Sequence, residues 1–419
     1  MRLMLPPALL PDTGRRRFLR GAGVGALATP LVLSSIGGPA FAQEGGGGGG
    51  VVTGRDLPDR AVGRPQPQAE KEPPLPPGER VGYAIVGLGK FALGQIIPAF
   101  AESKRSRLAA LVSGNRDKAL ATARQYGVDE ASVYDYQTFD RIADNPAVDV
   151  VYVILPNALH AEYTIRAFQA GKHVMCEKPM ANTVEECRQM IEAGRKAGRK
   201  LMVAYRAHHE PHNMEAIRMA RGGELGQVKL VTSDHGRHLD PKDPADQWRM
   251  DKSLAGGGSL YDIGIYSLQA ARYMTGEEPV EIRAMMHTPQ DDPRFKEVED
   301  TVTWQMAFPS GALALCSSSY SIDDTKRITA LGSKAGLRLD PATNYEGNQL
   351  YLRRGGSETH MKVQDKSQFA GEMDHLAQAI KENKPVNTPG EEGLQDVRLM
   401  QMIYESAREG RPVKVAEGR

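Results

Sequence analysis

Between residues 81 and 205 the chain alternates short, continuous apolar runs with amphipathic stretches of helical period. Strands buried on both faces of a sheet read as continuous apolar runs, whereas helices covering such a sheet repeat with a period of about 3.6 residues. The alternation therefore predicts a doubly wound parallel sheet, that is, an α/β Rossmann domain over residues 81–205. The expected strands are 81–86, 107–113, 149–155, 172–176 and 200–205, and the expected helices are 92–101, 158–170 and 183–198.

From residue 226 the pattern changes to apolar runs separated by short turns, which predicts an antiparallel sheet. A helix at 211–221 precedes this sheet, and another helix follows the Gly-rich stretch 255–258. Two C-terminal helices, 369–383 and 392–409, are expected to pack back on the first domain. We therefore predict an α+β domain with a large, mostly antiparallel, open-faced sheet over residues 206–419. Its expected strands are 226–236, 279–287, 298–308, 311–320 and 325–332.

The N-terminus has the pattern of an export signal. Arg15-Arg16-x-Phe18-Leu19 is followed by an apolar, Gly/Ala-rich run over 21–36 and by the small-x-small sequence Ala40-Phe41-Ala42. The apolar run is too short and too broken by Gly and Pro for a comfortable membrane span. Residues 1–42 are therefore predicted to be a twin-arginine signal peptide, which directs the folded protein to the periplasm. The alternative is an uncleaved N-terminal anchor.

Residues 43–80 are predicted to lack a packed core. They include six consecutive glycines at 45–50 and seven prolines between Pro58 and Pro77. Such a composition lacks apolar periodicity and favours flexible or extended chain. Two interpretations stay open, a tether without fixed structure and an extended arm that lies on this subunit or on a neighbour.

Composition excludes several kinds of partner. The formal net charge of +1 gives no electrostatic reason to expect nucleic acid, or an anionic membrane once the protein is exported. The three cysteines form no CxxC pair, and the histidines show no convincing ligand spacing, so we predict no metal site.

A glycine-rich turn after the first strand predicts a dinucleotide site. The turn reads Gly87-Leu88-Gly89-Lys90-Phe91-Ala92, in which Gly87 allows a tight turn and Gly89 allows the backbone to approach a pyrophosphate. The N-terminus of the following helix would hold that pyrophosphate. The context of strand and helix makes the motif specific, although its last position is Ala.

The end of the second strand favours NADP over NAD. NAD enzymes usually place Asp or Glu there to bind the ribose 2′-hydroxyl. This chain has Ser113-Gly114-Asn115-Arg116 instead, with Lys118 one turn into the next helix. A hydroxyl, an amide and two cations suit a 2′-phosphate. The alternative is that the two cations merely solvate the start of the helix.

Two further segments carry candidate chemistry. Glu177-Lys178-Pro179 follows the fourth strand, at the carboxyl edge where parallel sheets bind cofactors. Asp262 and Tyr266 are four residues apart at the start of the helix that ends near Tyr273, so they share one helix face.

These two segments together resemble the Gfo/Idh/MocA oxidoreductases. Most of that family has His where this chain has Tyr266, so the sequence is similar to a narrower branch, the glucose–fructose oxidoreductases. The resemblance runs from about residue 82 to residue 413. It also rests on Leu155-Pro-Asn-Ala-Leu-His-Ala-Glu162 and Val174-Met-Cys-Glu-Lys-Pro-Met180.

The resemblance implies an enzyme that oxidises an aldose such as glucose to its lactone and uses the retained NADPH to reduce a second sugar, fructose, to sorbitol. Tyr266 would exchange the proton of the sugar hydroxyl. A phenol titrates near 10, so Lys178 would have to lower its pKa as well as orient the sugar. Asp262 would bind substrate and order the polar groups, and a cis bond before Pro179 would aim Lys178 inward.

The resemblance also implies further cofactor contacts. Asn157 and His160 are expected to line the nicotinamide ribose, although His160 could merely cap its helix. Arg206 is expected near the nicotinamide or the sugar, the alternative being a surface ion pair. The remaining predicted cofactor residues are Leu155, Pro156, Glu177, Lys178, Trp248, Arg249 and Tyr345.

Retention of NADP would explain export in the folded state, with the Pro-rich arm clamping the cofactor. We also expect a homodimer or homotetramer formed through the C-terminal sheet. Two other functions stay open, a plain NADP-dependent aldose or inositol dehydrogenase with exchangeable cofactor and a sugar- or dinucleotide-binding protein without turnover.

Overall fold

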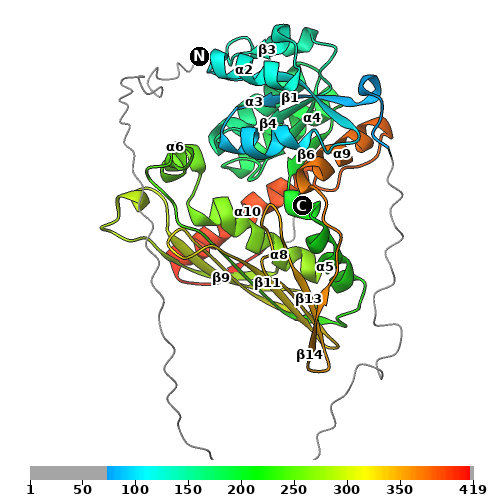
Figure 1. Cartoon of the computed structure of the whole chain (residues 1–419). Coiled ribbons are helices and arrows are strands. Elements are labelled where there is room, and N and C mark those ends of the chain that lie inside the picture. Colours follow the sequence, from blue (N-terminus) through cyan, green and yellow to red (C-terminus); the bar gives the residue numbers. More distant parts are fainter. Residues whose placement is uncertain (1–72, 416–419) are drawn as a thin grey trace, which may run out of the picture. The chain divides into compact units, whose positions relative to one another are not determined.

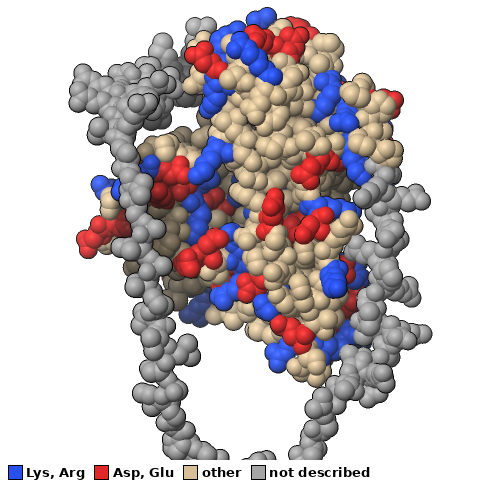
Figure 2. Space-filling view, in the orientation of Figure 1, with Lys and Arg blue, Asp and Glu red and all other residues tan. Residues whose placement is uncertain are grey.

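The computed structural model describes residues 73–415. The predicted signal peptide and most of the predicted arm lie outside the described residues. The end of that arm, residues 73–80, lies against the first domain, where the Leu75 amide donates to the Lys104 carbonyl at 2.8 Å. None of the described helices is long and apolar enough to cross a membrane. Figure 2 shows acidic and basic side chains interspersed on the face drawn there.

The first domain is built on a six-stranded sheet in the order β3-β2-β1-β4-β5-β6, with all neighbours parallel. The order reverses between β1 and β4, which opens a crevice at the carboxyl edge. The predicted Rossmann fold is confirmed. Its strands are β1 (Val81–Val86), β2 (Ser106–Val112), β3 (Val133–Tyr134), β4 (Val150–Val153), β5 (His173–Glu177) and β6 (Leu201–Ala204).

Capping residues in the sequence mark where the helices of this domain begin and end. Thr183 and Glu186 form a reciprocal capping box at the start of α4, and Gly198 ends that helix in the left-handed conformation. The predicted helix 92–101 is instead a π-helical turn, Ala92–Ile96, followed by the short α1; Pro98 has no N–H to donate within the turn. The helices are α1 (Ile97–Ala99), α2 (Arg116–Tyr126), α3 (His160–Gln169) and α4 (Val184–Ala197).

The second domain contains a nine-stranded sheet in the order β14-β13-β12-β11-β7-β10-β9-β8-β15. The chain leaves β7, passes through α8, β8 and β9, and returns as β10 beside β7 in the same direction. This pair is parallel, and the other neighbouring strands of the sheet pair antiparallel, so the predicted mostly antiparallel sheet is confirmed. A crossover that contains a helix allows the parallel pairing. The strands are β7 (Val228–Gly236), β8 (Glu281–His287), β9 (Thr301–Ala307), β10 (Leu313–Ser319), β11 (Thr325–Gly332), β12 (Gly336–Leu339), β13 (Leu350–Arg354), β14 (Ser357–Met361) and β15 (Val413–Lys414).

Helices cover one face of the nine-stranded sheet, with α8 against β7, α10 against β8 and α5 beside β12 (Figure 1). Strand β9 alternates buried and exposed positions, as a sheet with one covered face requires. The other face exposes large apolar side chains, among them Met285 and Leu313. The helices are α5 (Pro211–Arg221), α6 (Pro244–Gln247), α7 (Lys252–Ala255), α8 (Ile265–Thr275), α9 (Gln368–Lys381) and α10 (Gly390–Glu409).

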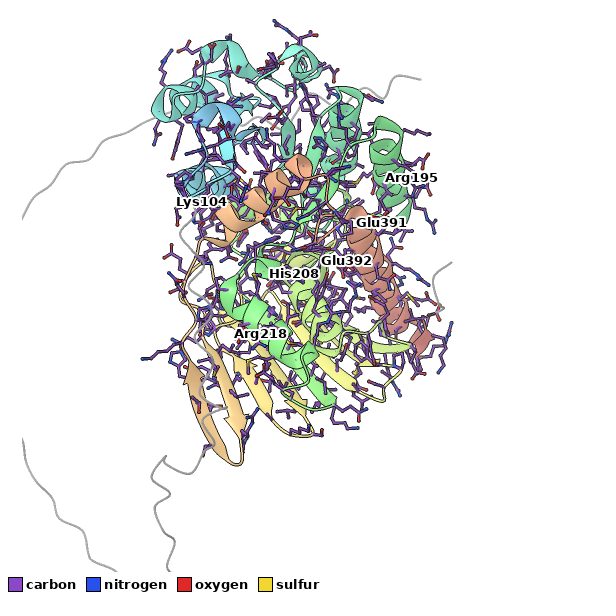
Figure 3. The ribbon with its side chains drawn as sticks, turned by 90° about the vertical axis from the view of Figure 1, so that its right-hand side faces the viewer. Lys104, Arg195, His208, Arg218, Glu391 and Glu392 are labelled. Atoms are coloured by element: carbon purple, nitrogen blue, oxygen red, sulfur yellow. The ribbon has the colours of Figure 1, made fainter. Side chains whose placement is uncertain are left out.

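The last two long helices pack on the first domain, as predicted. Apolar residues of α9, including Phe369 and Met373, join the core formed by Tyr83 and its neighbours in β1. The Asp374 carboxylate of α9 accepts from the Lys104 backbone amide at 2.8 Å, and Figure 3 shows Lys104 beside this helix.

Helix α10 carries a fully buried carboxylate toward the first domain. Asp396 accepts from Arg272 of α8 at 2.7 Å, from Gln269 at 2.7 Å and from the Tyr205 hydroxyl. Tyr205 directly follows β6, so this network joins the two domains. A buried charge is stable only with such partners.

Candidate active site

The glycine-rich turn has the shape that a dinucleotide requires. Gly87 has a φ of 97°, and a Cβ placed there would lie 2.1 Å from the Ile154 carbonyl oxygen, so only glycine fits. A Cβ placed on Gly89 would meet no atom within 4 Å, so its backbone faces open space. Lys90 is exposed, Leu88 and Ala92 are buried, and Phe91 packs against Tyr345 with ring centres 6.0 Å apart. The turn therefore fits a pyrophosphate.

No carboxylate stands at the end of β2. The buried Ser113 hydroxyl accepts from the Asn115 amide, and Asn115 in turn caps α2 by accepting from the Lys118 amide. The Lys118 ammonium donates to the Leu88 carbonyl at 2.6 Å, which holds α2 to the glycine-rich turn. Gly114 lies against the Tyr136 ring, and Arg116 is exposed.

At the carboxyl edge of β4, the predicted contact of His160 with the nicotinamide ribose requires a correction. His160 is fully buried, and its two ring nitrogens lie 2.9 Å from the Pro179 carbonyl and 2.8 Å from the Leu155 carbonyl. It therefore positions the segments around Leu155-Pro156 and Pro179 and has no ring nitrogen to offer a ribose. The Asn157 amide donates to the Ala255 carbonyl at 2.8 Å, which ties this edge to the second domain.

Lys178 reaches from the end of β5 across to the second domain. The predicted cis bond between Lys178 and Pro179 is present. The Lys178 ammonium donates to the main-chain carbonyl of Asp262 at 2.5 Å and lies 3.8 Å from the Asp262 carboxylate. Burial lowers the pKa of Lys178, opposed by the charges of Asp262 and Glu177.

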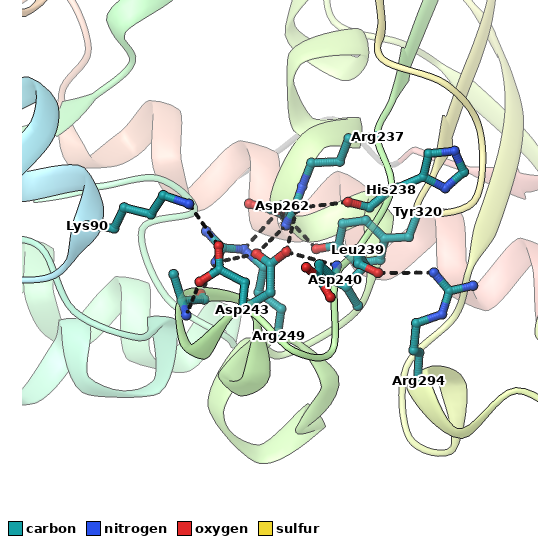
Figure 4. A network of polar contacts seen from close by, with 12 residues as sticks. Lys90, Arg237, His238, Leu239, Asp240, Asp243, Arg249, Asp262, Arg294 and Tyr320 are labelled. Atoms are coloured by element: carbon teal, nitrogen blue, oxygen red, sulfur yellow. Dashed lines mark hydrogen bonds and ion pairs between the residues drawn. The ribbon is translucent and has the colours of Figure 1, made fainter. Parts of the chain in front are cut away.

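Asp262 is the centre of a polar network (Figure 4). Its Oδ2 accepts from Arg249 at 3.0 Å, from Arg237 at 3.2 Å and from the Tyr320 hydroxyl at 3.0 Å. Burial alone would raise the pKa of this carboxyl, but Arg249, Arg237 and Lys178 together hold it well below its usual range. Asp262 is therefore ionised, and its Oδ1 faces Lys178.

The same network extends toward the glycine-rich turn. Lys90 pairs with Asp243 at 2.8 Å, and Arg249 packs over the Trp248 ring with its guanidinium carbon 4.4 Å from the ring centre. The Lys90–Asp243 pair therefore ties the glycine-rich turn to the segment that continues to Arg249 (Figure 4).

Tyr266 lies between two cations. The Lys178 Nζ is 4.8 Å from the centre of its ring and the Arg206 guanidinium carbon is 4.9 Å from it. His235 stacks on the ring at 5.5 Å. Burial raises the pKa of Tyr266 to about 12, and Arg206 opposes that rise. The expectation of a lowered pKa is therefore wrong for the cofactor-free protein, because burial outweighs the cations.

Arg206 is buried, which excludes the alternative of a surface ion pair. It donates to the Thr343 carbonyl at 2.8 Å and to the Gln368 side chain at 2.8 Å. Its guanidinium carbon also lies 4.8 Å from the centre of the half-exposed Tyr345 ring. Arg206 thus joins Tyr266 to Tyr345, which in turn contacts Phe91 of the glycine-rich turn.

Glu177 contacts residues that the sequence analysis did not identify. The Tyr152 hydroxyl donates to Glu177 at 2.6 Å and lies 3.2 Å from Glu372 of α9. Arg237 and Tyr320 were also missed, although each directly follows one strand of the parallel pair β7 and β10. Since the carboxyl ends of parallel strands meet at one edge, recognising that pair would have placed both residues beside Asp262.

The structure thus brings Lys178, Asp262, Tyr266 and Arg206 together beside an open glycine-rich turn. A phenol between two cations can exchange a proton with a bound hydroxyl group. Among the described residues, no cluster of His, Cys, Asp and Glu could hold a metal ion.

Comparison with known proteins covers both domains. Residues 81–205 match the model of the Gfo/Idh/MocA oxidoreductase family described as an NAD-binding Rossmann fold, and residues 217–415 match its C-terminal alpha/beta domain. The chain is 31% identical over 334 residues to a D-xylose 1-dehydrogenase [NADP(+)] of Haloarcula marismortui, covering 78% of this chain and 91% of the relative. It is 29% identical to a D-glucoside 3-dehydrogenase of Escherichia coli, covering 79% and 97%.

A solved structure is more similar. The aldose-aldose oxidoreductase from Caulobacter crescentus, in complex with glycerol, is 52% identical, with a TM-score of 0.78 over 80% of this chain and all of that chain. These findings confirm three predictions: the two-domain fold, an oxidoreductase acting on sugars, and a nicotinamide dinucleotide as its cofactor.

Proposed function

Because this chain belongs to the Gfo/Idh/MocA oxidoreductases, we propose that it uses NADP to oxidise an aldose to its lactone and returns the hydride to a second sugar. The observation that carries this proposal is the position of Tyr266 between Lys178 and Arg206. Through Arg206 and Tyr345 this group is in contact with Phe91 of the glycine-rich turn. When bound, NADP supplies the acceptor and then the donor of the hydride.

The protein's own residues would handle the proton. Tyr266 would take the proton of the sugar hydroxyl during oxidation and return one during reduction. Lys178, held by the Asp262 carbonyl, would orient that hydroxyl, and Arg206 would stabilise the phenolate of Tyr266. Asp262 keeps Lys178 and Arg249 in place, with its Oδ1 3.8 Å from the Lys178 ammonium and its Oδ2 accepting from Arg249.

The preference for NADP is supported by the end of β2 and by one relative. That end carries Ser113, Asn115 and Arg116 and no carboxylate that would repel a 2′-phosphate. The Haloarcula relative is named as an NADP(+) enzyme.

The second sugar is where the proposal changes from the sequence prediction. The prediction was fructose, reduced to sorbitol. The structure that is 52% identical is named an aldose–aldose oxidoreductase, which favours a second aldose as the acceptor. We therefore propose an aldose as the preferred acceptor and treat fructose as the competing substrate.

Export and assembly are part of the same proposal. A twin-arginine signal would carry the folded protein, with its cofactor, to the periplasm, and the arm at residues 43–80 would help to retain NADP. The open face of the nine-stranded sheet, with Met285 and Leu313 exposed by 75% and 52%, would form a homodimer or homotetramer. A Met285→Lys variant that stays monomeric in sedimentation experiments would support this interface, and an unchanged oligomer would exclude it.

One experiment separates the proposed function from its alternatives. The protein is purified without added cofactor, its reduced-nicotinamide absorbance is recorded, and glucose is added, followed by a second aldose or by fructose. We expect glucose to reduce the bound NADP, which raises this absorbance, and the second sugar to reoxidise the NADPH, which lowers it again. An empty protein that needs added NADP would indicate a plain dehydrogenase, and unchanged sugars with NADP present would indicate a binding protein.

A further inference from the structure

Two carboxyl groups share one tyrosine behind the candidate site. Tyr152 of β4 is fully buried, and its hydroxyl oxygen lies 2.6 Å from Oε1 of Glu177 and 3.2 Å from Oε1 of Glu372. Glu177 precedes Lys178 and is partly exposed, whereas Glu372 of α9 is fully buried. The three groups join the sheet of the first domain to α9.

The number of hydrogens decides the protonation of this group. A phenol has one hydrogen, so Tyr152 cannot donate to both carboxylates. The shorter contact indicates that Tyr152 donates this hydrogen in a hydrogen bond to Glu177. The contact with Glu372 is then a hydrogen bond only if the Glu372 carboxyl carries a proton and donates it to the Tyr152 oxygen.

The other oxygen of Glu372 gives independent support. Its Oε2 is buried without a hydrogen-bond partner among the described residues. An ionised carboxylate with a bare buried oxygen is costly, whereas the carbonyl oxygen of a neutral acid tolerates this far better. Burial raises the pKa of both carboxyls. The Tyr152 hydrogen bond and the charge of Lys178 oppose this rise at Glu177, whereas the charge of Glu177 adds to it at Glu372 and holds the Glu372 pKa well above its ordinary value.

We propose that Glu372 is a positioning residue that holds a proton in the chain Glu372–Tyr152–Glu177 and thereby keeps Glu177 ionised beside Lys178. Glu372 touches neither substrate nor cofactor in this proposal. It acts through Tyr152: the Glu372 carboxyl donates its proton in a hydrogen bond to the Tyr152 oxygen. The Tyr152 hydrogen can then remain in the hydrogen bond to the Glu177 carboxylate.

The charge balance around Tyr266 gives this proton its consequence. The cations that face Tyr266 are Lys178, which directly follows β5, and Arg206, which follows β6. Asp262 is matched by Arg237 and Arg249. On the side of α9 and β1, Tyr83 is neutral, with its hydroxyl donating to the Met373 carbonyl.

With Glu372 neutral, the two cations face one anion, Glu177, and the surplus positive charge favours the phenolate of Tyr266. With Glu372 ionised, the surplus would disappear. This effect on activity rests on the proposed role of Tyr266, whereas the protonation of Glu372 does not.

The first test is infrared spectroscopy of the full chain without cofactor or sugar, at neutral pH. A protonated carboxyl has a carbonyl stretching band that a carboxylate lacks. We expect such a band in the wild-type protein and in Glu382→Gln, which alters an exposed glutamate just after α9, and its loss in Glu372→Gln. An unchanged band in Glu372→Gln, or no band in the wild-type protein, would overturn the proposal.

The second test uses the pH profile of sugar oxidation. The side-chain amide in Glu372→Gln can donate to Tyr152 as the neutral acid does. The rate of sugar oxidation by this variant is therefore expected within about twofold of wild type, and its profile against pH should rise and fall at the same pH values. Glu372→Leu lacks that donor and is expected to lower kcat by about tenfold with little change in KM. A shifted limb in Glu372→Gln, at unchanged thermal stability, would show that the wild-type residue is ionised and would contradict the proposal.

The two tests also separate the two proposals. The infrared band depends only on Glu372 and Tyr152. If the band behaves as expected and no sugar is oxidised, the proposed function is wrong while the proposal that Glu372 is protonated is supported.

Discussion

The ammonium of Lys178 donates to the main-chain carbonyl of Asp262 at 2.5 Å, so the end of a Rossmann strand is bonded to the π-helical turn that leads into α8. The contact crosses from one domain to the other. It places the cation beside the ring of Tyr266, which lies one turn further along the chain. Together with the Asp396 network and the bond from Asn157 to Ala255, this contact fixes the position of Tyr266 relative to the first domain.

Replacing Lys178 with methionine is expected to lower kcat for sugar oxidation by about a hundredfold or more, because both the orienting donor and the contact with Asp262 are lost. Binding of the dinucleotide, followed by fluorescence titration, should change far less. Lys196→Met, at an exposed lysine of α4, is the control and should retain wild-type kinetics. Equal losses in both variants would remove Lys178 from the mechanism.

Tyr266→Phe keeps the ring between its two cations and removes only the hydroxyl. We expect hydride transfer to slow by about a hundredfold to ten-thousandfold in both directions, since proton exchange is lost. Single-turnover measurements with pre-bound cofactor would show this directly. Tyr273→Phe, on the same helix, should leave the rate nearly unchanged; a Tyr266→Phe enzyme with normal turnover would assign the proton to another group.

In the proposed mechanism, Arg206 helps to set the pH at which Tyr266 loses its proton. Burial raises the pKa of Tyr266 to about 12 in the cofactor-free protein, and Arg206 lowers it. Oxidation needs the deprotonated phenol, so its rate should rise with pH, whereas reduction should fall. In Arg206→Met the rise should move to higher pH, with about a tenfold lower rate at a given pH for each unit of displacement.

The profile of oxidation rate against pH, measured with saturating cofactor, tests this expectation. Arg218→Met, which removes an exposed arginine of α5, should leave the profile in place. Displacement of the Arg206→Met profile toward lower pH would contradict the proposed role.

Asp262 should stabilise the protein above the ordinary pKa of an aspartate and not below it. Its folded pKa is held well below that value by Arg249, Arg237 and Lys178 against the effect of burial. The contribution is therefore present above about pH 4 and is lost as the pH falls further. Asp262→Asn should lower the free energy of unfolding by about 3 kcal/mol at neutral pH, because Lys178 loses its nearby carboxylate and Arg237 and Arg249 keep only Asp246.

Denaturant unfolding at several pH values measures this difference. The gap between wild type and Asp262→Asn should narrow as both are acidified, while Asp144→Asn, at an exposed aspartate, should show little difference at any pH. A gap that does not depend on pH would mean that packing rather than charge makes the contribution.

Lys118 links α2 to the glycine-rich turn and supplies positive charge where a 2′-phosphate would bind. Lys118→Glu should weaken NADP binding by at least about tenfold while changing NAD binding less, since a carboxylate there repels the phosphate. Calorimetric titration with both dinucleotides compares the two affinities. Gln125→Glu, further along the same helix, is the control, and an equal loss of both affinities would indicate damage to the turn instead.

The sequence predicted β1, β2, β4, β5 and β6 of the first domain because these strands are mostly apolar runs, whereas β3 was missed because it has only two residues. Strands β13 and β14 were missed because they carry charged and exposed side chains, such as those of Arg354 and Glu358, and show no clear alternation. The parallel pairing of β7 with β10 was missed because hydrophobic patterns report burial and not the neighbour of a strand.

The site was predicted in part for a related reason. Lys178, Asp262 and Tyr266 stand in recognisable local patterns, and the structure brings them together. The partners Arg237, Tyr320 and Glu372 come from distant segments, which only the folded sheet brings near. The burial that raises the pKa of Tyr266 and the two carbonyls that occupy His160 are likewise properties of the packed structure.

Helix α9 has a consequence for how the protein is made. It covers one side of the first domain's core, yet it begins at residue 368, near the end of the chain. A ribosome delivers the Rossmann strands long before it delivers this helix, and the Asp374 carboxylate that holds Lys104 arrives at the same late stage. Nascent chains are therefore expected to expose the apolar side of β1 until α9 has been made, and products truncated before α9 should be recognised by chaperones and degraded.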